Sequence, residues 1–284
     1  MKSLALYTGL SFVLLVSCGG CEKQTEVEGE TIPKAPTCLI ATQTMKELVS
    51  PSQQSQLDVE TVTINGESFQ VSTTRKSVYT YDAYGRILTE YNQYAGSQAH
   101  YNGANSDSVY YQYMPSAVSI RTIRFADSGK KESIDLIALN KQGYAPKRPN
   151  GYEATYDKDG YLLTLKDQWG EAKVDKGNVV ESLFVDSPVT PSYITKSEYD
   201  LSKPGLHSVQ GFYGKTSRNL LIKQTIDEKF TTQLYPGVHT VKYSYVFNET
   251  GNVKRQIFRG KDGELGYIYG GDRVTVTDFT YSCP

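Results

Sequence analysis

The sequence is poor in the residues that most often carry enzyme chemistry. Its 284 residues include three histidines, one tryptophan and four cysteines. It contains no H-E-x-x-H zinc motif and no G-x-S-x-G nucleophile elbow. His100, His207 and His239 stand far apart, and we expect each of them on the surface or in a loop. We therefore assign no catalytic residue, no metal ligand and no cofactor, and we expect that the protein is not an enzyme.

Two further absences exclude whole classes of protein. The formal net charge is −1, and lysines and arginines alternate with acids instead of forming a basic run. Nucleic-acid binding, which depends on clustered positive charge, is therefore not expected. Beyond residue 16 no apolar run approaches the 18 residues of a membrane-spanning helix, so we expect no span there.

Two sequence motifs are incomplete, and a third possible site has no defined residues. Asp157-Lys158-Asp159-Gly160 begins like a calcium loop but lacks the later ligands, and a turn accounts for it. Gly211–Thr216 ends in Gly-Lys-Thr, but Val209 stands where a phosphate-binding loop has its first glycine. Acids are plentiful, so a carboxylate pair for glycoside hydrolysis stays open, although nothing in the sequence singles one out.

The N-terminus reads as an export signal. Lys2 precedes an apolar run from Leu4 to Val16, which is too short to span a bilayer. Leu15-Val16-Ser17-Cys18 resembles a bacterial lipobox, which implies removal of residues 1–17 and lipidation of Cys18. The alternative is an ordinary secretory signal with an incidental cysteine. The lipobox predicts a protein held in the bacterial cell envelope by acyl chains that contribute about 0.8 kcal/mol per buried CH₂. We expect the anchor at the outer membrane and leave open whether the protein faces the periplasm or the cell surface.

Residues 18–56 have the composition of a tether. They are rich in Glu, Thr, Ser, Gln, Gly and Pro, and such a segment buries too little apolar surface to offset its ordering entropy. We expect at most a helical turn near Met45–Val49. Residues 57–284 are then the folded domain, attached to the membrane through the lipid.

The remaining cysteines leave one pairing open. An exported protein meets an oxidising compartment, so Cys38 and Cys283 could form a disulfide if the two ends of the folded part lie side by side. Such a bridge would close a very long loop. Cys21 is left over beside the predicted anchor, and a metal-binding pair with Cys18 is disfavoured because no second pair exists.

Strand-forming runs separated by turn residues fill the rest of the chain. Twenty-three tyrosines, with Thr, Val and Ile, favour half-buried strands. In the pattern Asp/Asn-x-x-Gly the side chain accepts from backbone N–H groups further on, and the glycine adopts positive φ without steric cost. The turn signals are Asn65-Gly66, Asp82–Gly85, residues 126–131, Asn140–Gly143, Asp157–Gly160, Asp175–Gly177, Asn248–Gly251 and Gly270-Gly271.

This succession predicts an all-β fold, an antiparallel meander of tandem hairpins. Short turns make sequential strands neighbours, and roughly eighteen strands exceed what a flat open sheet supports. We therefore expect a single strongly curved or barrel-like sheet instead of a two-sheet sandwich. No segment has a 12-residue helical pattern, and residues 203–221 are expected to be a long loop with one helical turn.

Two resemblances follow from these residues. Tyr79–Ile87, YTYDAYGRI, resembles the YD repeat of Rhs-type proteins, and residues 156–162 keep part of it. That resemblance implies hairpin chemistry only, since this chain is far too short to form an encapsulating shell.

The second resemblance covers most of the chain after the signal. The lipobox, the polar tether, the degenerate hairpins and segments 136–148, 176–182, 211–221 and 245–258 together resemble a family of secreted Bacteroidetes lipoproteins of unknown function with a porin-like fold. The resemblance implies a curved antiparallel sheet and supplies no activity and no catalytic residues.

The tyrosines can be understood in two ways. Tyr243 and Tyr245 share a strand face, as do Tyr267 and Tyr269, whereas Tyr110 lies opposite Tyr111 and Tyr113. Such aromatic residues usually pack across strands, but exposed ones on a concave surface suit sugars or peptides. We expect a cell-envelope lipoprotein that binds a glycan, a peptide or a partner protein. The alternative is an exported polysaccharide hydrolase, which needs a cleft with two carboxylates about 5–10 Å apart.

Overall fold

The computed structural model describes residues 38–49, 58–96, 103–148, 151–167, 170–185, 192–215, 217–228, 238–260 and 273–283. The chain divides into two compact units, residues 1–32 and 33–284, and every described residue belongs to the second. The predicted signal and the lipidation site at Cys18 lie outside the described residues and stay predictions. Within the described ranges no helix has the length and apolar character needed to cross a bilayer.

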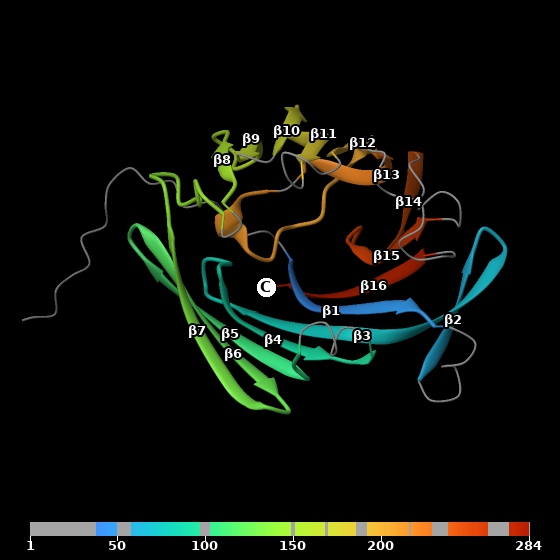
Figure 1. Ribbon diagram of the computed structural model, residues 1–284, viewed down its shortest axis with the longest axis horizontal. Helices are drawn as coiled ribbons and strands as arrows, with labels where there is room; N and C mark the ends of the chain where they lie inside the picture. The colour runs from blue at the N-terminus through green and yellow to red at the C-terminus, as the bar shows by residue number, and fades with distance from the viewer. Residues whose placement is uncertain are drawn as a thin grey trace, which may run out of the picture. The chain divides into compact units, whose positions relative to one another are not determined.

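Sixteen strands form one antiparallel sheet, as the sequence predicts, although roughly eighteen strands were expected (Figure 1). The strands are β1 (Leu39–Leu48), β2 (Val59–Ile64), β3 (Glu67–Tyr81), β4 (Ile87–Tyr94), β5 (Ser106–Met114), β6 (Ala117–Ala126), β7 (Gly129–Ala138), β8 (Glu153–Tyr156), β9 (Leu162–Asp167), β10 (Gly170–Asp175), β11 (Asn178–Val185), β12 (Ser192–Pro204), β13 (Asn219–Glu228), β14 (Val238–Phe247), β15 (Val253–Gly260) and β16 (Arg273–Ser282).

The strand order shows how the sheet is assembled. It runs β7-β6-β5-β4-β3-β1-β16-β15-β14-β13-β12-β11-β10-β9-β8, with β2 paired to β3 beside this path. The strands thus form two meanders, β3–β7 and β8–β16, and β1 joins them. The sheet is not closed, because β7 and β8 are its two edges.

β1 corrects the predicted boundary of the tether. Residues 39–48 were expected to belong to the polar tether 18–56, with a helical turn near Met45, but they form a strand inside the sheet. Their composition is polar because Thr42, Thr44 and Lys46 alternate with Gln43 and Met45, so neither face is a simple apolar row. Backbone hydrogen bonds compensate for the missing apolar face, because β1 pairs with β3 on one side and with β16 on the other.

Four Asx-x-x-Gly turns have the same hydrogen bonds. In each, the N–H of the glycine donates to the main-chain carbonyl of the Asx residue, and the Asx Oδ1 accepts from two later N–H groups. The glycines have φ between 77° and 82°. The four turns are Asp82–Gly85, Asn140–Gly143, Asp157–Gly160 and Asn248–Gly251. The mechanism predicted from the sequence is confirmed at these positions.

One of these turns does not form a hairpin. The turn Asn140–Gly143 lies between β7 and β8, which are the opposite edges of the sheet. Local turn chemistry fixes the reversal but not which strands pair afterwards. The expectation that every turn joins neighbouring strands is therefore wrong here.

The concave face carries the main apolar core at one end of the sheet. The loop between β12 and β13 enters the curve of the sheet and forms a short 3₁₀ helix, η2 (Gly211–Tyr213), so the predicted loop with one helical turn is found within residues 205–218 (Figure 1). Phe212 of η2 is buried with its ring 6.0 Å from that of Tyr111. The cluster comprises Ile40, Tyr79, Ile87, Val109, Tyr111, Val118, Ile137, Ala145, Phe212, Leu220, Val253 and Phe279. Burying Phe212 contributes roughly 1.5–3 kcal/mol.

Tyrosines connect strands on this face through their hydroxyl groups. Tyr81 of β3 donates to the carbonyl of Ile40 at 2.7 Å, and Tyr281 of β16 donates to that of Val253 at 2.8 Å. Tyr245 donates to the carbonyl of Leu221 at 2.6 Å. The rings pack while the hydroxyls satisfy backbone oxygens, so these tyrosines serve packing, the commoner of the two roles considered for them.

A smaller core lies on the other face, where the β2–β3 hairpin covers β15 and β16. Phe279 belongs to the concave core, whereas Val274 and Val276 belong to this one, as the alternation of a strand requires. The members are Val62, Ile64, Val71, Ile257, Val274 and Val276, with Phe69 packed against them.

Two acids and two bases form a closed ion-pair cluster beside this core. Arg255 contacts Asp278, and its Nη2 lies 3.0 Å from Glu60. Lys46 Nζ lies 2.8 Å from Asp278 and also contacts Glu60. Burial by itself would raise the pKa of Asp278, but hydrogen bonds from Arg255 and Lys46 outweigh it, and the pKa lies below its usual value of 3.8. The cluster joins β1, β2, β15 and β16.

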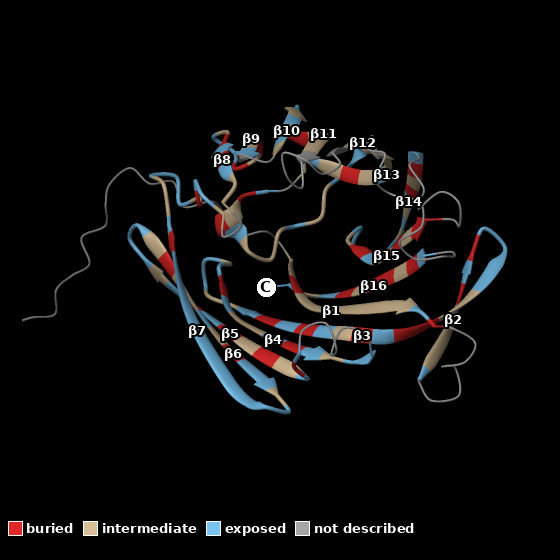
Figure 2. Cartoon of the chain, in the orientation of Figure 1, coloured by how far each residue is buried: buried red, intermediate tan, exposed pale blue. Residues whose placement is uncertain are grey.

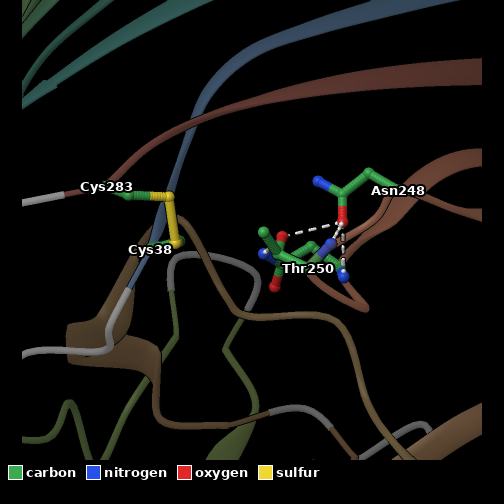
Figure 3. The surroundings of a disulfide bond; sticks show 5 residues. Cys38, Asn248, Thr250 and Cys283 are labelled. Carbon is green, nitrogen blue, oxygen red and sulfur yellow. Dashed lines mark hydrogen bonds between the residues drawn. A yellow bond between two sulfur atoms is a disulfide. The ribbon is translucent and has the colours of Figure 1, made fainter.

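A disulfide connects the start of β1 to the end of β16. Cys38 and Cys283 are joined at an S–S distance of 2.09 Å across 245 residues (Figure 3). The pairing is a consequence of register, because the adjacent residues Leu39 and Ser282 are direct partners in the β1–β16 ladder. Figure 3 also shows Asn248 accepting hydrogen bonds within its turn.

The turn glycines give a test of stability. Gly160→Val and Gly251→Val should each lower the free energy of unfolding by more than about 1 kcal/mol, because a β-branched residue resists positive φ. Gly160→Val should cost more, since a Cβ there would lie 2.6 Å from Tyr144 Cζ, whereas nothing lies within 4 Å at Gly251. Urea denaturation measures the free energy of unfolding of both variants. The control is Lys158→Ala, at an exposed position of the turn Asp157–Gly160. Wild-type stability in either variant would contradict the turn assignment.

The ion-pair cluster gives a test of pH dependence. Because the pKa of Asp278 is lowered in the folded state, its contribution to stability is complete above about pH 4 and is lost as the pH falls through the folded pKa. Asp278→Asn should cost roughly 1–3 kcal/mol at pH 7, and it should be less sensitive than the wild type to a shift to pH 3. Glu132→Gln, which removes a partner of exposed Arg121, is the control and should change stability little. If the free energy of unfolding falls equally between pH 7 and pH 3 in Asp278→Asn and in the wild type, this role of Asp278 is contradicted.

Candidate binding groove on the concave face

The groove lies on the concave face away from the apolar core, where four adjacent strands meet. Two cross-strand rows line it. One row runs Tyr243, Phe258, Thr275, Glu47 across β14, β15, β16 and β1, and the next row contains Gln256, Thr277 and Met45. Together with Arg273, these seven residues line a groove of about 300 Å³. Strand register therefore brings together residues as far apart in the sequence as Met45 and Thr277.

The groove combines aromatic surface with hydrogen-bonding groups. The rings of Tyr243 and Phe258 meet edge to face, with centroids 5.5 Å apart and planes at 79°. The guanidinium carbon of Arg273 lies 5.4 Å from the centroid of the Phe258 ring. Thr275 and Gln256 offer both donors and acceptors. Such a surface suits a ligand with apolar faces and many hydroxyl groups.

A hydrogen bond to the neighbouring strand β13 fixes the side chain of Tyr243. Its hydroxyl donates to Gln224 Oε1 at 2.6 Å, from the neighbouring strand β13. Burial, with smaller contributions from Tyr245 and Tyr199, raises the pKa of Tyr243 to about 12, so the hydroxyl stays protonated at physiological pH. The ring orientation at the groove is therefore fixed before any ligand arrives.

The opposite part of the concave face is filled by a polar network. Asn92 Nδ2 donates to Glu90 Oε1 and to Asp107 Oδ1, each at 2.9 Å. The two acceptor oxygens are therefore at most 5.8 Å apart, the sum of the two distances. Tyr94 donates to Asp107 at 2.8 Å and Tyr111 donates to Glu90 at 3.0 Å. Asp107 is only 5% exposed and Glu90 is half-buried, so packed structure covers one carboxylate of the pair and part of the other.

A second hollow of about 440 Å³ lies at the ends of the β8–β11 hairpins. It is lined by Asp157, Leu163, Val174, Lys176, Gly177 and Arg218. Arg218 lies 3.7 Å from Asp157 and over the ring of Tyr161, and its N–H donates to the carbonyl of Gly177. Its side chains therefore serve the packing of two turns, and it offers no aromatic surface of its own among the lining residues.

The residues considered from the sequence are distributed as follows. His207 is exposed in the loop after β12, as expected, and His100 lies outside the described residues. His239 of β14 is 4% exposed, so its expected place on the surface or in a loop is wrong, because its position on the strand turns it inward. Among the described residues, no group of three or more His, Cys, Asp or Glu could hold a metal ion.

The incomplete motifs have structural roles. Asp157 Oδ1 accepts from the N–H groups of Asp159 and Tyr161 within its turn. In the segment Gly211–Thr216, Phe212 is buried and Gly214 packs against the ring of Tyr156, while Thr216 lies outside the described residues. Tyr110 is exposed and Tyr111 buried, which places them on opposite faces as the alternation predicts. Tyr267 and Tyr269 lie outside the described residues.

Only part of the groove could be recognised from the sequence. The shared face of Tyr243 and Tyr245 was recognisable, but their partners Phe258, Thr275 and Glu47 depend on register between strands. The alternation of Gln256 with Phe258 two residues later is the one local signal that could have extended the set.

Comparison with known proteins finds a likeness among solved structures but no match to a family model or to a curated protein. Among solved structures, a porin-like protein from Bacteroides uniformis aligns over 87% of this chain and 100% of its own, with 15% identity and a TM-score of 0.47. A likeness this weak supports no statement about function, and membership of the Bacteroidetes lipoprotein family stays a prediction.

Proposed function

We propose that this protein is a cell-envelope lipoprotein that binds a saccharide in the groove on its concave face. The observation that carries the proposal is the row Tyr243–Phe258–Thr275–Glu47, which sets aromatic rings beside a hydroxyl and a carboxylate. A sugar ring presents apolar C–H faces to aromatic side chains and hydroxyls to polar ones. The proposed location at the outer membrane rests on the signal and lipobox in residues 1–18.

The form of the groove favours a saccharide over the other ligands considered. A volume of about 300 Å³ is at the small end for ligand pockets, which suits a few sugar residues better than a folded partner. An extended peptide commonly adds to the edge of a sheet, whereas this groove lies on a face four strands wide. Threonine, glutamine and glutamate side chains match hydroxyl groups, which both donate and accept.

Substitution of Phe258 tests the proposal. Phe258→Ala removes one ring of the aromatic pair and should weaken saccharide binding about five- to tenfold. Binding partners would first be identified on an array of glycans that includes bacterial envelope saccharides, and affinities then measured by calorimetry. The matched control is Phe125→Ala, which removes an exposed ring from the other face of β6 and should leave affinity unchanged. Equal losses in both variants, or an array without any bound glycan, would contradict the proposal.

The hydrolase alternative is favoured by one observation. Glu90 and Asp107 have oxygens at most 5.8 Å apart, a separation compatible with a retaining glycosidase pair. Against it, Asp107 is buried and accepts from Asn92 and Tyr94, which is the environment of a structural carboxylate.

Product analysis separates the two functions. We expect wild-type protein to release no reducing ends from the glycans that it binds, and Glu90→Gln to keep full glycan affinity. Hydrolysis by the wild type that is abolished in Glu90→Gln, with Lys131→Gln as a charge-loss control on the concave face, would establish the alternative instead.

A further inference from the structure

The two edges of the sheet differ in how they are protected. β8 has four residues, and the chain before it covers it, because Ala154 N–H donates to the carbonyl of Pro146 and Lys147 bridges to Glu153. β7 has ten residues and no second partner strand within the described part of the chain. Long uncovered edges are sites where another strand can add. Natural sheets usually block such edges, so β7 needs an explanation.

β7 has charged side chains at four positions, Lys130, Lys131, Glu132 and Asp135, but it lacks the other devices that block an edge. It contains no proline, and its ladder with β6 runs from Ala117↔Ala138 to Ala126↔Gly129 without a bulge. Nine of its ten residues are exposed, and Figure 2 shows the strand pale blue along most of its length. Ile134 and Leu136 are 66% and 67% exposed. Exposed aliphatic residues on an open edge favour association.

The outward-facing peptide groups of β7 can be identified. Leu139 N–H donates to the carbonyl of Ser116, so residue 139 forms a hydrogen-bonded pair with β6. Because such pairs alternate along an antiparallel ladder, the odd-numbered residues of β7 bond to β6. The even-numbered residues Lys130, Glu132, Ile134 and Leu136 therefore direct their N–H and C=O groups away from the sheet.

We propose that β7 pairs with β7 of a second copy of this chain, antiparallel and around a two-fold axis at Ser133. In this register Glu132 faces Ile134 of the other copy and Lys130 faces Leu136, so outward groups meet outward groups. Lys131 faces Asp135 twice, which gives two ion pairs across the axis. The lysine stem of Lys130 covers the exposed side chain of Leu136. The contact is isologous, as a two-fold dimer requires.

Neighbouring registers are less favourable. Only registers shifted in steps of two keep the outward groups paired. In the register centred on Glu132, the two Glu132 side chains lie opposite each other and repel. In the register centred on Asp135, the two Asp135 side chains do the same. Centring on Ile134 avoids like charges but places Lys131 opposite Ile137 and loses both ion pairs. Charge therefore selects the register centred on Ser133.

The contact is small, so it belongs to the weak class of interfaces. Nine residues of each strand, 129–137, take part in the ladder, which is less than a standard protein interface. Attachment of both copies to one membrane, which rests on the proposed lipidation, would raise their effective concentration. Covalent trapping is therefore the appropriate first experiment.

Single cysteines test the register directly. In the membrane-attached chain with Cys21→Ser and Cys18 retained as the proposed lipidation site, Ser133→Cys should form a disulfide-linked dimer on mild oxidation, because residues facing each other in a non-hydrogen-bonded pair have Cα atoms about 4.5 Å apart. Ile134→Cys is the matched control and should crosslink at least tenfold less. Residue 134 faces residue 132 of the other copy, so the two introduced cysteines lie diagonally opposite and too far apart for a disulfide. The background chain sets the zero level. Absence of the Ser133→Cys dimer, or equal crosslinking of both variants, would overturn the proposal.

A charge exchange tests the contact without cysteine. Lys131→Asp should abolish self-association measured by sedimentation velocity, and Lys131→Asp combined with Asp135→Lys should restore it. Neither change touches the groove, so saccharide binding should be the same in all three chains, which keeps a failure here separate from a failure of the proposed function. Unchanged association of Lys131→Asp, or no recovery in the double variant, would overturn the pairing.

Discussion

The whole sheet depends on the pairing of β1 with both β3 and β16. Each meander could form from local hairpins, and among the described strands β1 is the one hydrogen-bonded to both, through one ladder on each side. Three further interactions converge on the same strand. Cys38 is bonded to Cys283 at its beginning, Lys46 joins the ion-pair cluster with Asp278 and Glu60, and Ile40 and Gln43 accept hydrogen bonds from the hydroxyls of Tyr81 and Tyr79. A strand with little apolar surface is thus retained by polar and covalent contacts.

The local features of the fold could be predicted from the sequence, and the non-local ones could not. Asp82, Asp157 and Asn248 act within four residues of themselves, so the turn chemistry and the all-β class follow from pattern alone. Strand β1 was not predicted, because composition reports the average polarity of a segment and not the hydrogen bonds that two partner strands provide. The same limit applies to the turn at Asn140, whose geometry is right although its flanking strands lie at opposite edges.

The candidate groove shows this limit most clearly. Tyr243 and Tyr245 could be placed on one face from their spacing, but Phe258, Thr275 and Glu47 join them only through the registers of three ladders. The concave face is divided between two uses. Around Phe212 it is filled by packed side chains and a buried polar network, and around Phe258 it is left open. Tyrosine serves both parts, since its ring packs and its hydroxyl satisfies either a backbone oxygen or a side chain.

The bridge between Cys38 and Cys283 also decides how the domain responds to mechanical load. A pull on the chain upstream of Cys38 would otherwise act on the first residue of β1 alone. Because Cys38, which directly precedes β1, is bonded to Cys283, which directly follows β16, the load divides between two adjacent strands in the middle of the sheet. The bridge in this way protects the domain from unravelling, strand by strand, when force is applied to the chain before Cys38.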